Sequence, residues 1–191
     1  LLVSGVTASR ALIEAAIDAQ ADAIVVHHGL FWRGQDGRVV GWMKERLQRL
    51  LANEINLYAY HLPLDAHPQL GNNAQLGKVL GLQADAWCGD QNLVCVGQPH
   101  STLTFSNAAA LSAHVEACLG RAVTCIAPQD RPLKRIAWCS GGAQSYFESA
   151  IAHGVDAFVT GEISEPQAHI AKEMGVAFLA CGHHATERYG A

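Results

Sequence analysis

Residues 14–25, EAAIDAQADAIV, and residues 148–159, ESAIAHGVDAFV, carry the pattern from which the fold can be predicted. Each segment begins with apolar residues at helical spacing and ends in an apolar run that favours a strand. Six of the twelve aligned positions are identical, namely Glu14, Ala16, Ile17, Asp22, Ala23 and Val25. Composition alone can make Ala-rich helix-then-strand segments resemble one another, but we favour an internal duplication at an offset of 134 residues. Two such halves would offer a cleft between their strand ends.

Strand and helix patterns alternate on either side of both segments. WMKERLQRLLANE (42–54) places Met43, Leu47 and Leu50 on one helical face, and NLYAY (56–60) after it favours a strand. The second half repeats this rhythm, with strands expected at 135–139, 156–161 and 176–182 and helices at 144–154 and from near Pro166. Strands that alternate with helices predict a largely parallel sheet.

Residues 84–132 depart from this rhythm. They contain strand candidates at 93–97, 101–105 and 122–127 around one helix, which Ser106 could cap and Gly120 could end. We therefore predict an α/β fold in which two similar lobes, residues 1–83 and 133–191, have mainly parallel sheets facing a shared cleft. Residues 84–132 are predicted to form a small inserted α+β lobe. The chain opens on LLVSG without a methionine and stops at ATERYGA as a helix begins, so we expect a truncated core of a longer protein.

Composition indicates a folded protein without a membrane span. Half of the 191 residues are hydrophobic (50%) and 16% are charged, which suits a packed core. The net charge is −4 and the Lys and Arg residues are scattered, which argues against nucleic acid as the main partner. No apolar run reaches the roughly 18 residues of a membrane span. The six cysteines form no CxxC motif, so we expect reduced thiols and a cytoplasmic location.

Polar side chains follow three predicted strands at the points where they end. VVHHGLFW places His27 and His28 after one apolar strand, and YHLPLDAH places Asp65 after strand NLYAY. In CGHHATERYG, a helix would project His183 and Glu187 from one face, because they are four residues apart. Ligands bind at the carboxyl ends of strands in open α/β sheets. This placement favours a common binding site.

The same fragments have ordinary explanations when each is taken alone. Paired histidines can lie on the surface, Asp65 could bond backbone amides of its own turn, and Glu187 could be solvated at a helix start. Together, however, three imidazoles and two carboxylates exceed the roughly three protein ligands of one catalytic zinc. They suit two ions bridged by a carboxylate and a water. The mixed ligand set suits zinc, iron, manganese, cobalt or nickel about equally.

Two further residues are candidates for catalysis. His61 could be a ligand, a hydrogen-bond donor to a ligand, or a general base. The 134-residue offset sets Glu162 opposite His28, at the end of an equivalent strand. There Glu162 could orient a ligand imidazole or take a proton from the bridging water, whereas in an ordinary turn it would meet only solvent. We take His61 and Glu162 as the catalytic candidates.

Four segments, VVHHGLFW, YHLPLDAHPQLGNNAQL, DAFVTGE and GHHATERYG, closely resemble signature segments of the NIF-three-like family, known in bacteria as GTP cyclohydrolase I type 2 homologues. The resemblance runs nearly end to end and is loosest between residues 84 and 132. It implies that His27, His28, Asp65, His183 and Glu187 are the ligands of a dinuclear centre. It also implies a homo-oligomer, a ring-shaped hexamer whose metal sites face an internal cavity.

We therefore expect a dinuclear metal-binding protein that acts as a metal-dependent hydrolase on a small, nucleotide-like substrate. Two divalent transition-metal ions per chain would lower the pKa of a shared water and polarise the bond attacked. The cyclohydrolase name would make the substrate a purine nucleotide, although the sequence lacks a GxxxxGKS or GxxxxGKT phosphate loop. The alternative is a non-catalytic metal-handling or scaffold protein, which would need neither open coordination positions nor a nearby base.

Overall fold

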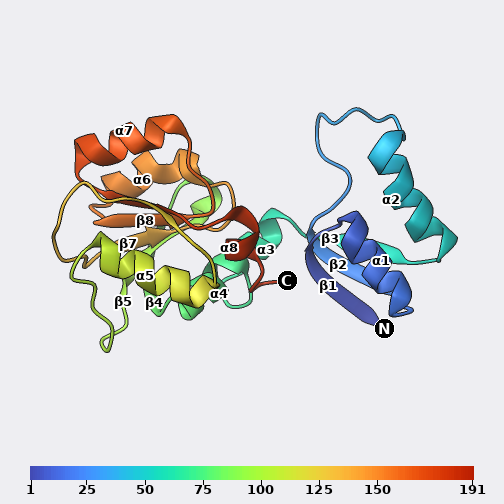
Figure 1. Cartoon of the computed structure of the whole chain (residues 1–191), viewed down its shortest axis with the longest axis horizontal. Helices are drawn as coiled ribbons and strands as arrows, with labels where there is room; N and C mark the ends of the chain where they lie inside the picture. The colour runs from blue at the N-terminus through green and yellow to red at the C-terminus, as the bar shows by residue number, and fades with distance from the viewer. The chain divides into compact units, whose positions relative to one another are not determined.

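A three-stranded parallel sheet forms the first of two units in the computed structural model, which describes residues 1–191 (Figure 1). This unit spans Leu1–Leu64, with the terminal Ala191. Ser9 starts its first helix, because the Ser9 side chain accepts a hydrogen bond from the backbone N of Leu12. The elements are β1 (Leu2–Thr7), α1 (Arg10–Asp18), β2 (Ala23–His28), α2 (Gly41–Ala52) and β3 (Asn56–Ala59).

The second unit, Asp65–Gly190, contains one six-stranded sheet in the order β4-β5-β7-β8-β9-β6. The strands β7, β8 and β9 are parallel, and β4, β5 and β6 pair antiparallel around them. Residues 84–132, which the sequence pattern sets apart, therefore extend this sheet on both sides. The strands are β4 (Leu82–Cys88), β5 (Val94–Pro99), β6 (Thr124–Ile126), β7 (Ile136–Trp138), β8 (Ala157–Thr160) and β9 (Ala177–Ala180).

Helices cover both faces of the six-stranded sheet (Figure 1). On one face, Trp138, Val159 and Leu179 pack in a core with side chains of α4 and α5. On the other, Phe147 of α6 meets Phe158 and Phe178, with ring centroids 5.8 and 4.9 Å away. Successive strand residues point to opposite faces, so one strand serves both cores. The helices are α4 (Asn72–Val79), α5 (Ala108–Leu119), α6 (Phe147–Ala152) and α7 (Glu165–Met174), with short turns η1 (Asp90–Asn92) and η2 (Gln144–Tyr146).

The two units repeat one arrangement of parallel strands. Leu2 pairs with Ala23 between β1 and β2, and Ile136 pairs with Ala157 between β7 and β8. Ile136 lies 134 positions after Leu2, and Ala157 lies 134 positions after Ala23, as the internal repeat predicts. The register of the strand pairing is therefore repeated, as well as the order of the strands. A five-residue helix follows the third strand of each set, α3 (Leu62–Ala66) and α8 (His183–Glu187). This agreement supports the internal duplication, and the predicted α/β class with parallel-strand sheets is confirmed.

Several local predictions between residues 62 and 126 differ from the structure. Residues 101–105 form no strand beyond one bridge from Phe105 to Leu133. Asn107 instead of Ser106 caps α5, accepting a hydrogen bond from Ala110 N, whereas Gly120 ends the helix as predicted. The apolar pattern predicts no helix at residues 72–79, where α4 lies, because the buried face of α4 includes Asn72 and Asn73 beside Leu76. None of the helices combines the length and the apolar character that a membrane span needs.

Candidate metal centre

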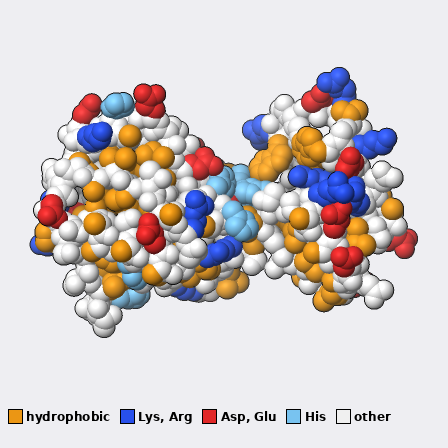
Figure 2. Space-filling view, in the orientation of Figure 1, with side chains coloured by type: hydrophobic (Ala, Val, Ile, Leu, Met, Phe, Trp, Pro, Cys, Tyr) orange, Lys and Arg blue, Asp and Glu red, His pale blue; other side chains and the backbone are white.

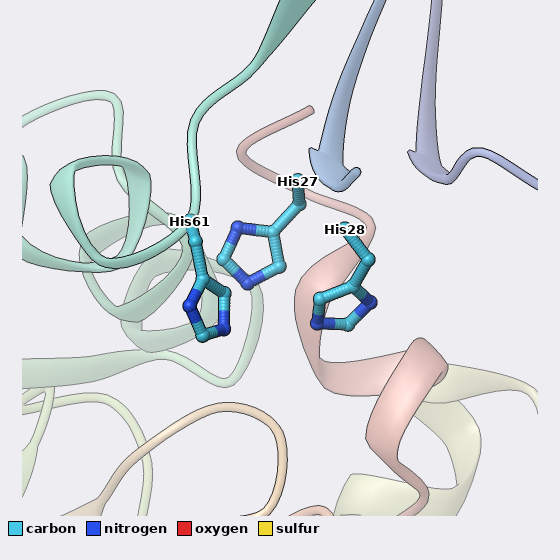
Figure 3. A group of neighbouring side chains, drawn as sticks. All are labelled: His27, His28 and His61. Carbon is cyan, nitrogen blue, oxygen red and sulfur yellow. The ribbon is translucent and has the colours of Figure 1, made fainter. Parts of the chain in front are cut away.

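Three imidazoles of the first unit gather at the ends of β2 and β3 (Figure 3). His27 and His28 are the last residues of β2, and His61 lies between β3 and α3. The ring centroid of His27 is 4.5 Å from that of His28 and 4.9 Å from that of His61. One nitrogen of each ring lies within 4.8 Å of the others, so this histidine cluster (His27, His28, His61) could hold a metal ion.

Hydrogen bonds and close packing orient the histidine cluster. His27 Nδ1 lies 3.1 Å from the carbonyl oxygen of Tyr60. A carbonyl only accepts, so Nδ1 carries the proton and Nε2 is the nitrogen able to coordinate an ion. His28 Nδ1 lies 3.1 Å from Thr7 Oγ1. Gly29 follows directly, and a Cβ there would come within 2.6 Å of Ala59 Cβ, which explains the glycine between the paired histidines and the loop.

Two carboxylates and one imidazole gather in the second unit. His183 and Glu187 are the first and last residues of α8, and His183 Nε2 lies 3.2 Å from Glu187 Oε1. Asp65 of α3 offers a carboxylate oxygen within 4.8 Å of one from Glu187. Asp65, His183 and Glu187 form what we call the acidic group. The predicted i,i+4 pairing of His183 with Glu187 on one helix face is therefore observed.

Electrostatics make the acidic group suitable for a cation. The residues Asp65 and Glu187 are buried, with 9% and 3% of their surface exposed. Two buried carboxylates this close repel each other unless a cation or a proton offsets their charge. Carboxylate oxygens beside imidazole nitrogens form a donor set that divalent transition metals accept. The donors of both the histidine cluster and the acidic group thus fit the ions expected from the sequence.

Glu162 lies against the acidic group. Glu162 Oε1 is 2.6 Å from Nδ1 of His183, the ring nitrogen opposite the one that meets Glu187. The Glu187 carboxylate, together with Glu162 and against partial burial, raises the pKa of His183 to about 9. The metal-free imidazole is therefore protonated at neutral pH, and an ion that binds Nε2 must displace that proton. Glu162 thus orients the ring so that its Nε2 faces Glu187.

Residues that the sequence analysis did not single out support Asp65. Its Oδ1 accepts hydrogen bonds from Asn72 Nδ2 at 2.9 Å and from Ser140 Oγ at 3.2 Å. Neither residue belongs to a motif of metal ligands. The sequence gives one indication of their role. In the segments GNNAQL and CSGGAQ, amides and a serine lie beside glycines near strand and helix ends.

Glycine at position 141 makes room for the acidic group. Gly141 has a positive φ of 67°, and a Cβ atom there would overlap Glu187 Oε1 and lie 3.1 Å from His183 Nε2. Its backbone N donates a hydrogen bond to Thr186 Oγ1 at 2.9 Å, within α8. The loop after β7 therefore passes directly against two predicted ligands, which only a residue without a side chain allows.

The cysteines take no part in these groups. All six are free thiols. Burial raises the pKa of Cys181, which lies just before α8, to about 12. A thiol with so high a pKa stays protonated and behaves as a small apolar residue.

The sequence profile of one family, Duf34/NIF3 (NGG1p interacting factor 3), matches residues 2–191. Proteins named "GTP cyclohydrolase 1 type 2 homolog" are similar along nearly the whole chain. The one from Neisseria meningitidis serogroup A is 51% identical over 189 residues, which cover 99% of this chain and 75% of that protein. The one from Yersinia pestis is 53% identical over 191 residues, with the same two coverages.

Solved structures show the same fold. One described as "Structural genomics, protein ybgI, unknown function" superposes with a TM-score of 0.94 at 48% identity, over 99% of this chain and 75% of that one. The structure of TTHA1606 from Thermus thermophilus superposes with a TM-score of 0.86 at 31% identity, covering 99% of this chain and 74% of that one. The chain therefore belongs to the Duf34/NIF3 family.

Proposed function

We propose that this protein is a metal-dependent hydrolase whose five ligands, His27, His28, Asp65, His183 and Glu187, hold two divalent transition-metal ions. The observation that carries the proposal is the pair of preformed donor groups, one of imidazoles and one of buried carboxylates with an imidazole. The relatives' name, GTP cyclohydrolase 1 type 2 homolog, makes a purine nucleotide the first substrate class to assay.

When bound, two such ions supply Lewis acidity, which acidifies water and polarises the bond to be cleaved. The chain's own groups supply orientation and proton transfer. Glu162 Oε1, 2.6 Å from His183 Nδ1, fixes the imidazole and carries negative charge beside the site. His61 lies in the histidine cluster, where its imidazole is placed to accept a proton from a reacting water. The predicted homohexamer, which rests on the resemblance, and the predicted cytoplasmic location, which rests on the cysteine pattern, belong to the same proposal.

Metal content tests the ligand assignment. After incubation with divalent transition metals and removal of excess ion, elemental analysis should find about two ions per chain, because five mixed ligands exceed the needs of one. Asp65→Ala and His183→Ala should each lose most of the bound metal with little change in circular dichroism. His61→Ala should lose hydrolysis of the nucleotide and keep both ions, because His61 is the proposed base and not one of the five proposed ligands. His169→Ala, at an imidazole with 65% of its side chain exposed, is the matched control. Saturation of the parent at one ion or none would contradict the two-metal centre.

Gly141→Ala tests whether the loop after β7 positions the acidic group. The added methyl would push the Glu187 carboxylate aside, so metal affinity should fall by about 10-fold to 100-fold, the range for residues that orient ligands. Gly154→Ala is a close control, because Gly154 has a similar φ of 68° but open space around its Cβ position. Isothermal titration with one metal compares the two variants. Equal affinities would show that Gly141 has no positioning role.

Glu162→Gln tests the role of the carboxylate beside His183. Glutamine keeps an oxygen that can accept from Nδ1 but removes the charge, so both ions should be retained while the pH profile of hydrolysis shifts. Glu165→Gln, with 88% of the Glu165 side chain exposed, should leave the profile unchanged. Identical pH profiles for Glu162→Gln and the parent would show that Glu162 has only a structural role.

A further inference from the structure

A cavity of about 550 Å³ lies in the first unit beside the histidine cluster. Its apolar walls come from Leu47, Leu50 and Leu51 on one side and Leu57 and Ala59 on the other. The first three belong to α2 and the last two to β3. Small-molecule sites have volumes of roughly 300–1000 Å³ and mostly apolar walls, so the cavity has the size and lining of such a site.

One end of the cavity contains site residues. His27 and His61 line it together with the loop that follows β2. Trp32 of this loop lies edge-on to His61, with ring centroids 4.9 Å apart and an interplanar angle of 87°. The Trp32 backbone N donates a hydrogen bond to Gln35 Oε1 within the same loop, at 3.1 Å. An aromatic side chain thus connects the apolar cavity to the histidine cluster.

The rim is aromatic and exposed. The exposed fractions of Phe31 and Trp32 are 74% and 43%, and Figure 2 shows hydrophobic side chains at the surface of this unit. Trp32 offers a flat face and a polar edge, which suits stacking against a ring. Exposed aromatic side chains beside a cavity favour an aromatic ligand.

The charged residues that line the cavity limit further which class of ligand it can bind. Arg33 is the only Lys, Arg, Asp or Glu residue that lines the cavity. One guanidinium matches one carboxylate or one phosphate through paired hydrogen bonds. A chain of phosphates bound here would need several cations, so the cavity wall suits a monoanion.

We propose that this cavity binds the non-reacting part of the substrate, and that this part is an aromatic ring bearing a single anionic group. The ring packs between Trp32 and the leucines of α2, the anion meets Arg33, and the bond to be cleaved lies toward His61. Binding energy from a remote part of a substrate positions the reacting bond. The inference rests on the proposed hydrolase function for the bond that is cleaved, and a substrate with one anionic group differs from the nucleoside triphosphate that the relatives' name suggests.

Calorimetric titration of the whole chain with 2-naphthoate tests this inference. We expect saturable binding at one site per chain with and without metal, because His27 is the only one of the five proposed ligands that lines the cavity. The neutral analogue 2-naphthalenemethanol should bind about tenfold more weakly, since it offers no anion to Arg33. Inorganic triphosphate should not displace naphthoate.

Matched variants locate the binding site. Trp32→Ala and Arg33→Gln should each weaken naphthoate binding by about tenfold. Trp42→Ala and Arg46→Gln serve as controls, because these two residues pack on each other, 4.8 Å from guanidinium carbon to ring centroid, and do not line the cavity. An effect of the controls equal to that of Trp32→Ala and Arg33→Gln would overturn the inference.

The outcomes separate this inference from the proposed function. Protein that binds two ions but no naphthoate overturns the cavity inference alone. Protein that binds naphthoate but no ions overturns the hydrolase proposal alone. Naphthoate binding only to chains dissociated by dilution would show that another copy fills the cavity, and it would also overturn the inference.

Discussion

Parallel strand pairing in one fixed register places every candidate ligand except Asp65, which lies in α3. The carboxyl ends of parallel strands lie at one edge of a sheet, so residues that follow β2 and β3 meet in the first unit, and those that follow β8 and β9 meet in the second. The repeated register makes the two sets equivalent in position although their chemistry differs. Imidazoles lie at the ends of the strands in the first unit, whereas Glu162 and His183 lie just after the strands of the second. One backbone arrangement used twice thus yields two complementary donor groups.

The acidic group concentrates charge that folding alone would avoid. Burying Asp65 and Glu187 within 4.8 Å of each other is unfavourable unless a cation or proton offsets the repulsion. Hydrogen bonds from Asn72 and Ser140 hold Asp65 in place, and the bare backbone of Gly141 leaves room for Glu187. Such a locally destabilising arrangement, held in place by its surroundings, is what a metal-binding site requires.

Much of the fold could be predicted because its signals are local. Helical spacing, apolar strands and the 134-residue repeat predicted the parallel strands, and the i,i+4 spacing predicted that His183 and Glu187 share a helix face. The antiparallel strands β4, β5 and β6 joining one sheet depend on long-range pairing that no local pattern encodes. The sequence pattern does not predict helix α4, because its buried face carries Asn72 and Asn73. The side-chain amides of these two residues donate hydrogen bonds to groups outside the helix. The supporting roles of Ser140 and Gly141 likewise become visible only once the chain is folded.

Five named residues are proposed to hold two metal ions. Diffraction from metal-loaded crystals, recorded at the absorption edge of the bound metal, tests this assignment most directly because anomalous scattering locates each ion among its ligands. We expect two anomalous peaks per chain, both coordinated only by members of the set His27, His28, Asp65, His183 and Glu187. A single peak per chain, or peaks coordinated by other residues, would contradict the two-metal centre.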